Sequence, residues 1–229
     1  MKTIGLIGGT MWVSTAEYYR RINEGINKKL GGLDFARCIL FSLNYGDIDR
    51  YSRTQDFQQI HSLLLDASKK VVAAGAECIA LCANTMHYYA DDLEREINVP
   101  LIHIGTATAK EIQSRKISTV GLLGTRMTME KDFYKSKLHQ YGITTLVPDE
   151  GDREYIHRAI DTELSQSVFS NSSRERFLRI IGNLSAQGAQ GIVLGCTEIP
   201  LLVKQEHSTI PLFDTIETHT KAILEFALQ

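Results

Sequence analysis

Long apolar runs and runs of like charge are both missing from this chain. Among its 229 residues, no apolar stretch approaches the roughly 18 residues that span a bilayer. The N-terminal segment MKTIGLIGG has too short an apolar run for a signal peptide. Lys and Arg number 25 against 27 Asp and Glu, with no basic run of the kind that tracks a phosphate backbone. We therefore expect a cytoplasmic protein that has neither a membrane nor a nucleic acid as its partner.

Cysteine is scarce, and no motif for a metal or a nucleotide cofactor is complete. The four cysteines are Cys38, Cys78, Cys82 and Cys196, which in a reducing compartment indicate free thiols rather than a disulfide framework. Cys78 and Cys82 with His87 are too few and wrongly spaced for a zinc site. The glycines near the N-terminus do not form G-x-G-x-x-G, and the other histidines share no spacing. We expect no metal and no nicotinamide cofactor.

The chain also lacks a linker or a low-complexity tract, but it repeats itself. Three blocks of the first half recur in the same order in the second half, about 113 residues later. The matched blocks are Thr3–Gly9 with Thr119–Thr125, Ala74–Thr85 with Gln187–Glu198, and Val99–His103 with Ile210–Asp214. Each block has the pattern of a buried strand followed by a turn. We interpret the two halves as copies of one α/β unit.

Local signals predict strands that alternate with helices along the whole chain. Ser14–Glu17 resembles a capping box and predicts a helix that continues through Ile26. Pro100 precedes a predicted strand at 101–104, in agreement with a first-residue or edge position. Alternation of this kind is typical of parallel sheets whose two faces are covered by helices.

The predicted fold class is therefore α/β, with two pseudo-symmetric lobes that each contain a parallel sheet flanked by helices. By the repeat, residues 1–100 plus 209–229 form the first lobe and residues 101–208 form the second. In such sheets ligands bind beyond the carboxyl ends of the strands. We expect the active site in the cleft between the lobes.

Cys196 is the strongest candidate for chemistry. It follows the buried strand Gly191–Gly195 and precedes a Thr-Glu pair at an expected helix start. A helix N-terminus favours the thiolate, so we expect a lowered pKa for this thiol. The alternative is a buried cysteine that acts as a small apolar side chain. Glu198 is the expected assisting group, which holds a proton or orients the thiol, unless it is an exposed carboxylate of the first helical turn.

The repeat places Ala83 opposite Cys196, so the first half has no thiol at the matching position. Cys82 lies one residue earlier, and in an extended strand a shift of one residue turns a side chain to the other face. Cys82 is thus either buried, as this geometry favours, or a second catalytic group if the strand has already broken into a loop. With Cys82 buried, Thr85, His87 or a bound water must supply the second acid or base.

Polar residues at the mirrored strand ends are the candidates for substrate binding. They are Asn84, Thr85 and Thr197, with Thr10 and Thr125 at the repeated glycine turns. Their side chains and nearby backbone amides can hold a carboxylate, and the alternative for each is helix capping. A second carboxylate needs a cation, for which Arg50 or Arg53 is the best candidate. The alternative for these arginines is a solvated surface position.

Three motifs together resemble the aspartate/glutamate racemase family, and the likeness runs the whole length of the chain. They are GLIGG at residues 5–9, NTMH at 84–87 and GCTE at 195–198. The resemblance implies two pseudo-symmetric lobes with the active site between them, no cofactor, a homodimer, and two cysteines that face each other across the substrate Cα. One thiolate removes the α-proton while the other thiol protonates the opposite face, because inversion needs a base and an acid on opposite faces.

The chain departs from that family at two places. The first family cysteine stands immediately before the Asn-Thr pair, where this chain has Ala83. The lysine of the family's aspartate enzymes has no clear match in Thr162–Gln166. Single-cysteine relatives in the wider superfamily include arylmalonate decarboxylase.

We predict a cofactor-independent racemase of acidic or other polar amino acids. One alternative is a one-thiol decarboxylase or isomerase. The other is a two-lobed sensor that binds a small molecule without catalysis.

Overall fold

The computed structural model describes residues 1–229, which divide into two compact units. Unit 1 comprises Met1–His103 and His219–Gln229, and unit 2 comprises Ile104–Thr218. Each unit contains one sheet of parallel strands with helices packed against it. The predicted α/β class with two parallel sheets is therefore confirmed.

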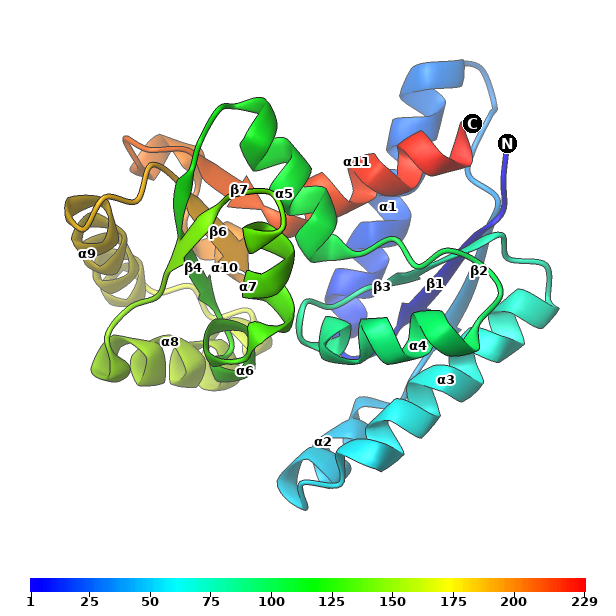
Figure 1. Ribbon diagram of the computed structural model, residues 1–229, viewed down its shortest axis with the longest axis horizontal. Coiled ribbons are helices and arrows are strands. Elements are labelled where there is room, and N and C mark those ends of the chain that lie inside the picture. Colours follow the sequence, from blue (N-terminus) through cyan, green and yellow to red (C-terminus); the bar gives the residue numbers. More distant parts are fainter. The chain divides into compact units, whose positions relative to one another are not determined.

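The sheet of unit 1 has three parallel strands, β1 (Ile4–Gly8), β2 (Cys38–Ser42) and β3 (Cys78–Leu81). Their order is β2-β1-β3, with the fully buried β1 at the centre (Figure 1). Leu101 adds a single parallel bridge to Ile79. The strand predicted at 101–104 is limited to this bridge, because α5 (Ile104–Ser114) already begins at Ile104.

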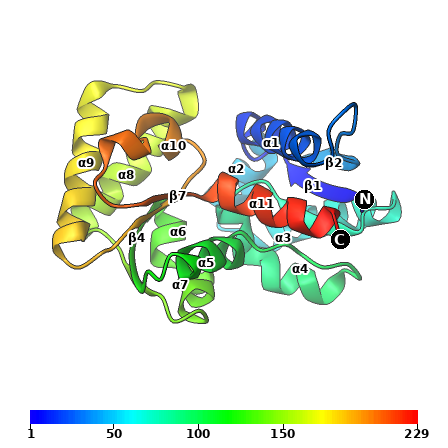
Figure 2. The same cartoon turned by 90° about the horizontal axis from the view of Figure 1, so that it is seen from above.

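Helices cover both faces of this sheet. They are α1 (Trp12–Leu30), α2 (Tyr45–Arg53), α3 (Phe57–Ala73), the 3-10 turn η1 (Thr85–Tyr89), α4 (Ala90–Glu96) and the larger part of α11 (Thr215–Ala227). Figure 2 shows α1 on one side of β1 and β2, and α3 with α4 on the other side. On the α3 face, Ile60, Leu64 and Val71 recur at helical spacing and belong to one apolar core with Ile79 and Leu81.

The start of α1 differs from its prediction. The helix begins at Trp12, and its N-cap residue Met11 makes no side-chain cap. Ser14 and Thr15 lie inside the first turn, where their hydroxyls donate to the carbonyl of Met11. Thr15 Oγ1 also accepts the N–H of Gly9 at 2.9 Å. These hydroxyls therefore tie the helix to the turn after β1 instead of forming a capping box.

Unit 2 contains a four-stranded parallel sheet in the order β5-β4-β6-β7. Its strands are β4 (Thr119–Gly124), β5 (Thr144–Leu146), β6 (Ile192–Gly195) and β7 (Leu212–Asp214). Its helices are α5, α6 (Arg126–Glu130), α7 (Asp132–His139), α8 (Glu150–Thr162), α9 (Asn171–Ala186) and α10 (Ile199–Leu202), with 3-10 turns η2 (Leu164–Gln166) and η3 (Gln205–His207). One core packs α8 and α9 against the sheet through residues such as Ile156 and Phe177. A second core packs α5 and α7 through Ile112 and Leu138.

Strand register shows that the two sheets are copies of one design. In unit 1 Gly5 pairs with Ile79, and in unit 2 Gly121 pairs with Ile192. These are the residues that the repeated blocks match with each other. Because the register continues without a bulge to the strand ends, the position after β3 that corresponds to Cys196 is residue 83.

The third repeated block also falls in register. Ile79 bridges to Leu101 in unit 1, and Ile192 pairs with Leu212 in unit 2. The amide of Ile79 donates to the carbonyl of Pro100 at 2.9 Å, and the amide of Ile192 makes the matching bond at 2.8 Å. The two sheets therefore share one topology.

The helices that follow these matched segments are exchanged between the copies. α5 follows Leu101 but packs in unit 2, whereas α11 follows β7 and belongs to unit 1 from His219 onward. Leu224 of α11 packs against Gly25 of α1. The sequence-based boundary at 209 put β7 in the first lobe, but β7 pairs with β6 in unit 2. Only the helix is exchanged, because β7 completes the sheet that precedes it.

Candidate functional site

Three predicted residues gather directly after β6 in unit 2. The Cys196 thiol donates to Glu198 Oε2 at 2.9 Å, and Thr197 Oγ1 donates to the same oxygen at 2.8 Å. Cys196 is 8% exposed and Glu198 is 7% exposed. The carboxylate of Glu198 thus accepts hydrogen bonds from both neighbouring side chains. The group lies at the carboxyl end of a parallel strand, where ligands bind in such sheets.

The pKa of Cys196 is raised well above its ordinary value, which is opposite to the expectation from the sequence. Burial of the sulfur is the main cause, followed by the charge of Glu198 and the hydrogen bond to its carboxylate. The expected helix is only the single turn α10, so it supplies little of the dipole that favours a thiolate. At neutral pH Cys196 is therefore a thiol.

Glycine allows the ends of β4 and β6 to approach closely. Gly124 pairs with Gly195, and a Cβ on Gly195 would lie 2.8 Å from the carbonyl oxygen of Leu123. A side chain at this position would force the two strands apart. Cys196 is the first residue after this pair of strands, so its side chain is the first one beyond the glycines.

The corresponding position at the strand end of unit 1 is Ala83, which has no thiol. Cys82 is 1% exposed and lies in a bend directly after β3, where its amide still donates to the carbonyl of Ile7 at 2.8 Å. Burial raises the pKa of Cys82, with a smaller contribution from Cys38. Ala83, the counterpart of Cys196, is partly exposed. This geometry favours the buried role for Cys82 over the catalytic one.

The predicted substrate-binding residues of unit 1 follow β1 and β3. Thr10, after the glycine turn, is 7% exposed, and Asn84 is 4% exposed. Thr85 begins η1 and is partly exposed. Asn84 precedes this turn without capping it through its side chain. Asn84 and Thr85 therefore lie at the carboxyl end of β3.

Other predicted contacts have local structural partners. Thr125 caps α6, where its Oγ1 accepts the N–H of Thr128 at 3.3 Å. The side chain of Arg50 is 66% exposed and pairs with Asp47 at 3.3 Å. Arg53 is likewise exposed and pairs with an aspartate of its own helix. The arginines of α2 thus have the solvated surface arrangement, which was the alternative to substrate binding.

A cluster of three histidines in unit 1, of which His87 and His219 are buried, was missed, because its members lie far apart in the sequence. The ring centroids of His87 and His103 are 4.8 Å apart, and those of His87 and His219 are 5.3 Å apart. His87 Nδ1 lies 2.9 Å from the carbonyl oxygen of Ala83, so it donates a hydrogen bond to that carbonyl. The NTMH motif was the available signal, since it puts His87 four residues after Ala83.

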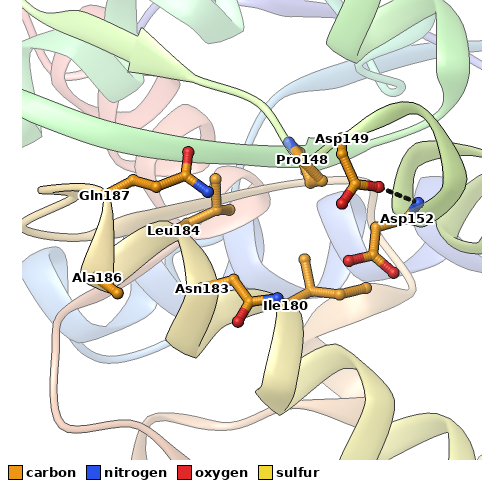
Figure 3. Close-up of a pocket in the computed structure, with 8 residues that line it drawn as sticks. All are labelled: Pro148, Asp149, Asp152, Ile180, Asn183, Leu184, Ala186 and Gln187. Carbon is orange, nitrogen blue, oxygen red and sulfur yellow. Dashed lines mark hydrogen bonds between the residues drawn. The ribbon is translucent and has the colours of Figure 1, made fainter.

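A cavity of about 300 Å³ lies elsewhere in unit 2, between the start of α8 and the end of α9 (Figure 3). Asp149 and Asp152 face it from one side and Asn183 and Gln187 from the α9 side. Asp149 caps α8 through the amide of Asp152 at 2.9 Å, and the Asp152 carboxylate pairs with Arg176 at 3.3 Å. These carboxylates have structural partners, and the cavity contains none of the predicted site residues.

The chain contains two parallel sheets of one topology. At the end of one central strand, a cysteine thiol is hydrogen-bonded to a carboxylate. The protein is thus a duplicated α/β protein with a cysteine at a strand end. The model of the Asp/Glu/Hydantoin racemase family matches residues 7–223, and the chain belongs to this family. No helix has the length and hydropathy that crossing a membrane requires. No group of three or more His, Cys, Asp and Glu side chains is arranged to hold a metal ion.

Individual relatives agree with this assignment. A candidate Asp/Glu racemase from Yersinia pestis is 45% identical, with a TM-score of 0.95 over 100% of both chains. An aspartate racemase homologue from Pyrococcus horikoshii OT3 is 36% identical, with a TM-score of 0.88 over 100% of both chains. The broad specificity amino-acid racemase RacX of Bacillus subtilis is 24% identical over 93% of this chain and 92% of its own length. The family and these relatives support an isomerase.

Proposed function

We propose that this protein is a cofactor-independent amino-acid racemase in which Cys196 exchanges the proton at the substrate Cα. The observation that carries the proposal is the hydrogen bond of 2.9 Å between the Cys196 thiol and Glu198 at the end of β6. Racemisation requires a group that both holds and releases a proton next to Cα. A cysteine with a carboxylate as its hydrogen-bond partner can do both.

In this proposal Glu198 controls the proton of Cys196. The thiol is the resting form, because burial and the carboxylate both raise its pKa. As a thiol, Cys196 delivers its proton to a Cα carbanion and becomes a thiolate. As a thiolate, it takes the α-proton of the same enantiomer that this delivery forms, and returns to the thiol. Thr197 keeps the Glu198 carboxylate in place through its bond of 2.8 Å.

The proton on the opposite face requires a different group, because Ala83 has none. Cys82 is a weaker substitute, because it lies one residue before the position that corresponds to Cys196 and is 1% exposed, against 8% for Cys196. Thr85, His87 and a water molecule stay candidates for this role. A side chain without an ionisable group at residue 83 also fits a one-thiol decarboxylase, which needs a proton on one face only.

We propose that the substrate is an acidic or other polar amino acid, held by Thr10, Asn84, Thr85, Thr125 and Thr197. The family name and the broad specificity racemase of Bacillus subtilis support amino acids as the substrate class. Arg50 would bind a side-chain carboxylate only by giving up its pairing with Asp47. A strict requirement for an acidic side chain is therefore less well supported than general amino-acid binding. The interlobe position of the site, a homodimer and a cytoplasmic location stay predictions.

The test is α-proton exchange in D₂O, followed by proton NMR on a panel of free L- and D-amino acids. We expect the wild-type protein to exchange the α-proton of at least one polar amino acid and to form its enantiomer. Calorimetric binding without exchange would instead support a sensor. Loss of CO₂ from a malonate-type acid would support the one-thiol decarboxylase. Either result without amino-acid exchange contradicts the proposal.

A further inference from the structure

The two exchanged helices are each held by a buried tyrosine. Tyr18 of α1 bonds His219 of α11 in unit 1 at 2.8 Å, and the Tyr134 hydroxyl donates to Thr108 of α5 in unit 2 at 3.0 Å. Tyr18 corresponds to Tyr134 when the offset of the first repeated block is continued beyond it, and Thr108 corresponds to His219 at the offset of the third block. All four residues are fully buried. Equivalent tyrosines thus hold the exchanged helix in each unit, by a hydrogen bond to a histidine in unit 1 and to a threonine in unit 2.

The histidine makes a second bond that fixes its tautomer. His219 Nε2 lies 2.6 Å from the carbonyl oxygen of Ile102. Because a carbonyl only accepts, Nε2 carries the proton and Nδ1 accepts the hydroxyl proton of Tyr18. Burial lowers the pKa of His219 to about 3, with a further contribution from His87. The imidazole is therefore neutral and bonded at both nitrogens.

His219 also reaches the strand end that carries the candidate substrate groups. Its ring packs edge-on against the ring of His87, with a centroid distance of 5.3 Å and an interplanar angle of 70°. His87 is 1% exposed and donates from Nδ1 to the carbonyl of Ala83 at 2.9 Å. A single chain of contacts thus joins Tyr18, His219, His87 and Ala83. This chain connects α1 and α11 to the end of β3.

From these contacts we infer that His219 is a positioning residue, which through His87 holds the Ala83–Thr85 segment in the geometry that binds substrate. The inference rests on the proposed function for its consequence in catalysis, and on the contacts alone for its consequence in structure. His219 does not touch the reacting atoms in this account. It acts by keeping the ring of His87, and hence the carbonyl of Ala83, in one place.

The first test compares Tyr18→Phe with Tyr134→Phe by hydrogen–deuterium exchange and mass spectrometry of the full-length protein. Each variant loses one buried hydroxyl, and each should lower Tm by about 2–6 °C. We expect faster exchange in peptides covering residues 83–89 in Tyr18→Phe, and unchanged exchange there in Tyr134→Phe. Equal exchange of this segment in the two variants would overturn the inference, whether or not the protein is a racemase.

The second test compares His219→Gln with His219→Leu. The Gln amide nitrogen can take the place of Nε2 and keep the bond to Ile102, whereas Leu removes both bonds. We expect KM to rise about three- to tenfold in His219→Leu, with kcat within about twofold, and to recover largely in His219→Gln. Equal KM values in both variants would contradict a positioning role. If the wild-type protein does not exchange the α-proton of any amino acid, the proposed function fails. The inference is then tested by hydrogen–deuterium exchange of residues 83–89 in the same two variants. Faster exchange in His219→Leu than in His219→Gln would support it, and equal exchange would overturn it.

Discussion

At the scale of single residues, the chain is asymmetric where its fold is symmetric. Equivalent strand ends carry Cys196 in unit 2 and Ala83 in unit 1. The sequence repeat was sufficient to predict this pairing, because both strands run without a bulge and the register preserves the alignment. That Cys82 turns to the other face stays a prediction, since residues on both faces of β3 are buried.

Restoring a thiol at residue 83 should increase racemisation. We expect Ala83→Cys to raise kcat about tenfold or more, because a positioned acid or base contributes on this scale. Ala83→Ser is the matched control, since a hydroxyl of similar size ionises too weakly to replace a thiol. The measurement is the rate of enantiomer formation by polarimetry. Equal rates in both variants would contradict the assignment of Ala83 to the second face.

The raised pKa of Cys196 predicts a pH profile. Because activity as a base needs the thiolate, kcat/KM should rise by about tenfold per pH unit on the alkaline side of neutrality. Glu198→Gln removes a charge that raises this pKa, so the profile should move to lower pH. The ultraviolet absorbance of the thiolate gives the same titration without substrate.

The control for that titration is Glu163→Gln. Glu163 is another carboxylate of unit 2, where it accepts a hydrogen bond from Ser173, and its removal should leave the titration of Cys196 in place. A profile that stays unchanged in Glu198→Gln, or moves to higher pH, would show that the carboxylate does not control this thiol.

At the scale of elements, the repeated strands were predictable and the helix details were not. Each strand in the matched blocks combines buried apolar residues with a following turn, a signal that is local in sequence. The predicted start of α1 was wrong, because the hydroxyls of Ser14 and Thr15 donate to the carbonyl of Met11 from inside the helix. The helix α2 was missed, since it is only 9 residues long and buries a single residue, Ile48.

Glycine at the end of β6 should matter more than glycine on a helix surface. Gly195→Ala places a Cβ 2.8 Å from a backbone carbonyl, and we expect a loss of about 1–3 kcal/mol in the free energy of unfolding. Gly182→Ala is the control, because Gly182 lies exposed in α9 with open space around its Cβ position. The free energy of unfolding of Gly182→Ala should rise by about 0.5–1 kcal/mol. Urea unfolding measures both, and similar losses in the two variants would refute the close-approach argument.

At the scale of the whole molecule, duplication was predictable but the exchange of helices was only partly so. The repeat predicted that residues 209–229 return to the first lobe, and of these His219–Gln229 belongs to unit 1. β7 does not, because strand pairing holds it in the sheet of unit 2. The histidine cluster depends on this exchange, since His219 comes from α11. No local pattern in the sequence contains that information.

The buried His219 predicts acid sensitivity of the folded state. Its pKa is lowered from 6.5 to about 3, so below pH 6.5 the unfolded chain binds a proton that the folded chain does not. As the pH is lowered from 6.5 towards 3, this group should therefore reduce the free energy of unfolding by about 1.4 kcal/mol per pH unit. His219→Gln lacks this loss. Its deficit relative to wild type, measured by urea unfolding, should shrink by about 2 kcal/mol between pH 6.5 and pH 5, and parallel pH curves would contradict the prediction.

The most direct measurement compares α-proton exchange of an amino-acid substrate in D₂O by Cys196→Ala and Cys82→Ala, with both folds checked by circular dichroism. We predict that Cys196→Ala abolishes exchange, whereas Cys82→Ala keeps it within about twofold, because Cys82 lies one residue before the position that corresponds to Cys196. Retained exchange in Cys196→Ala, with or without loss in Cys82→Ala, would contradict the central claim that the thiol at the end of β6 carries the chemistry.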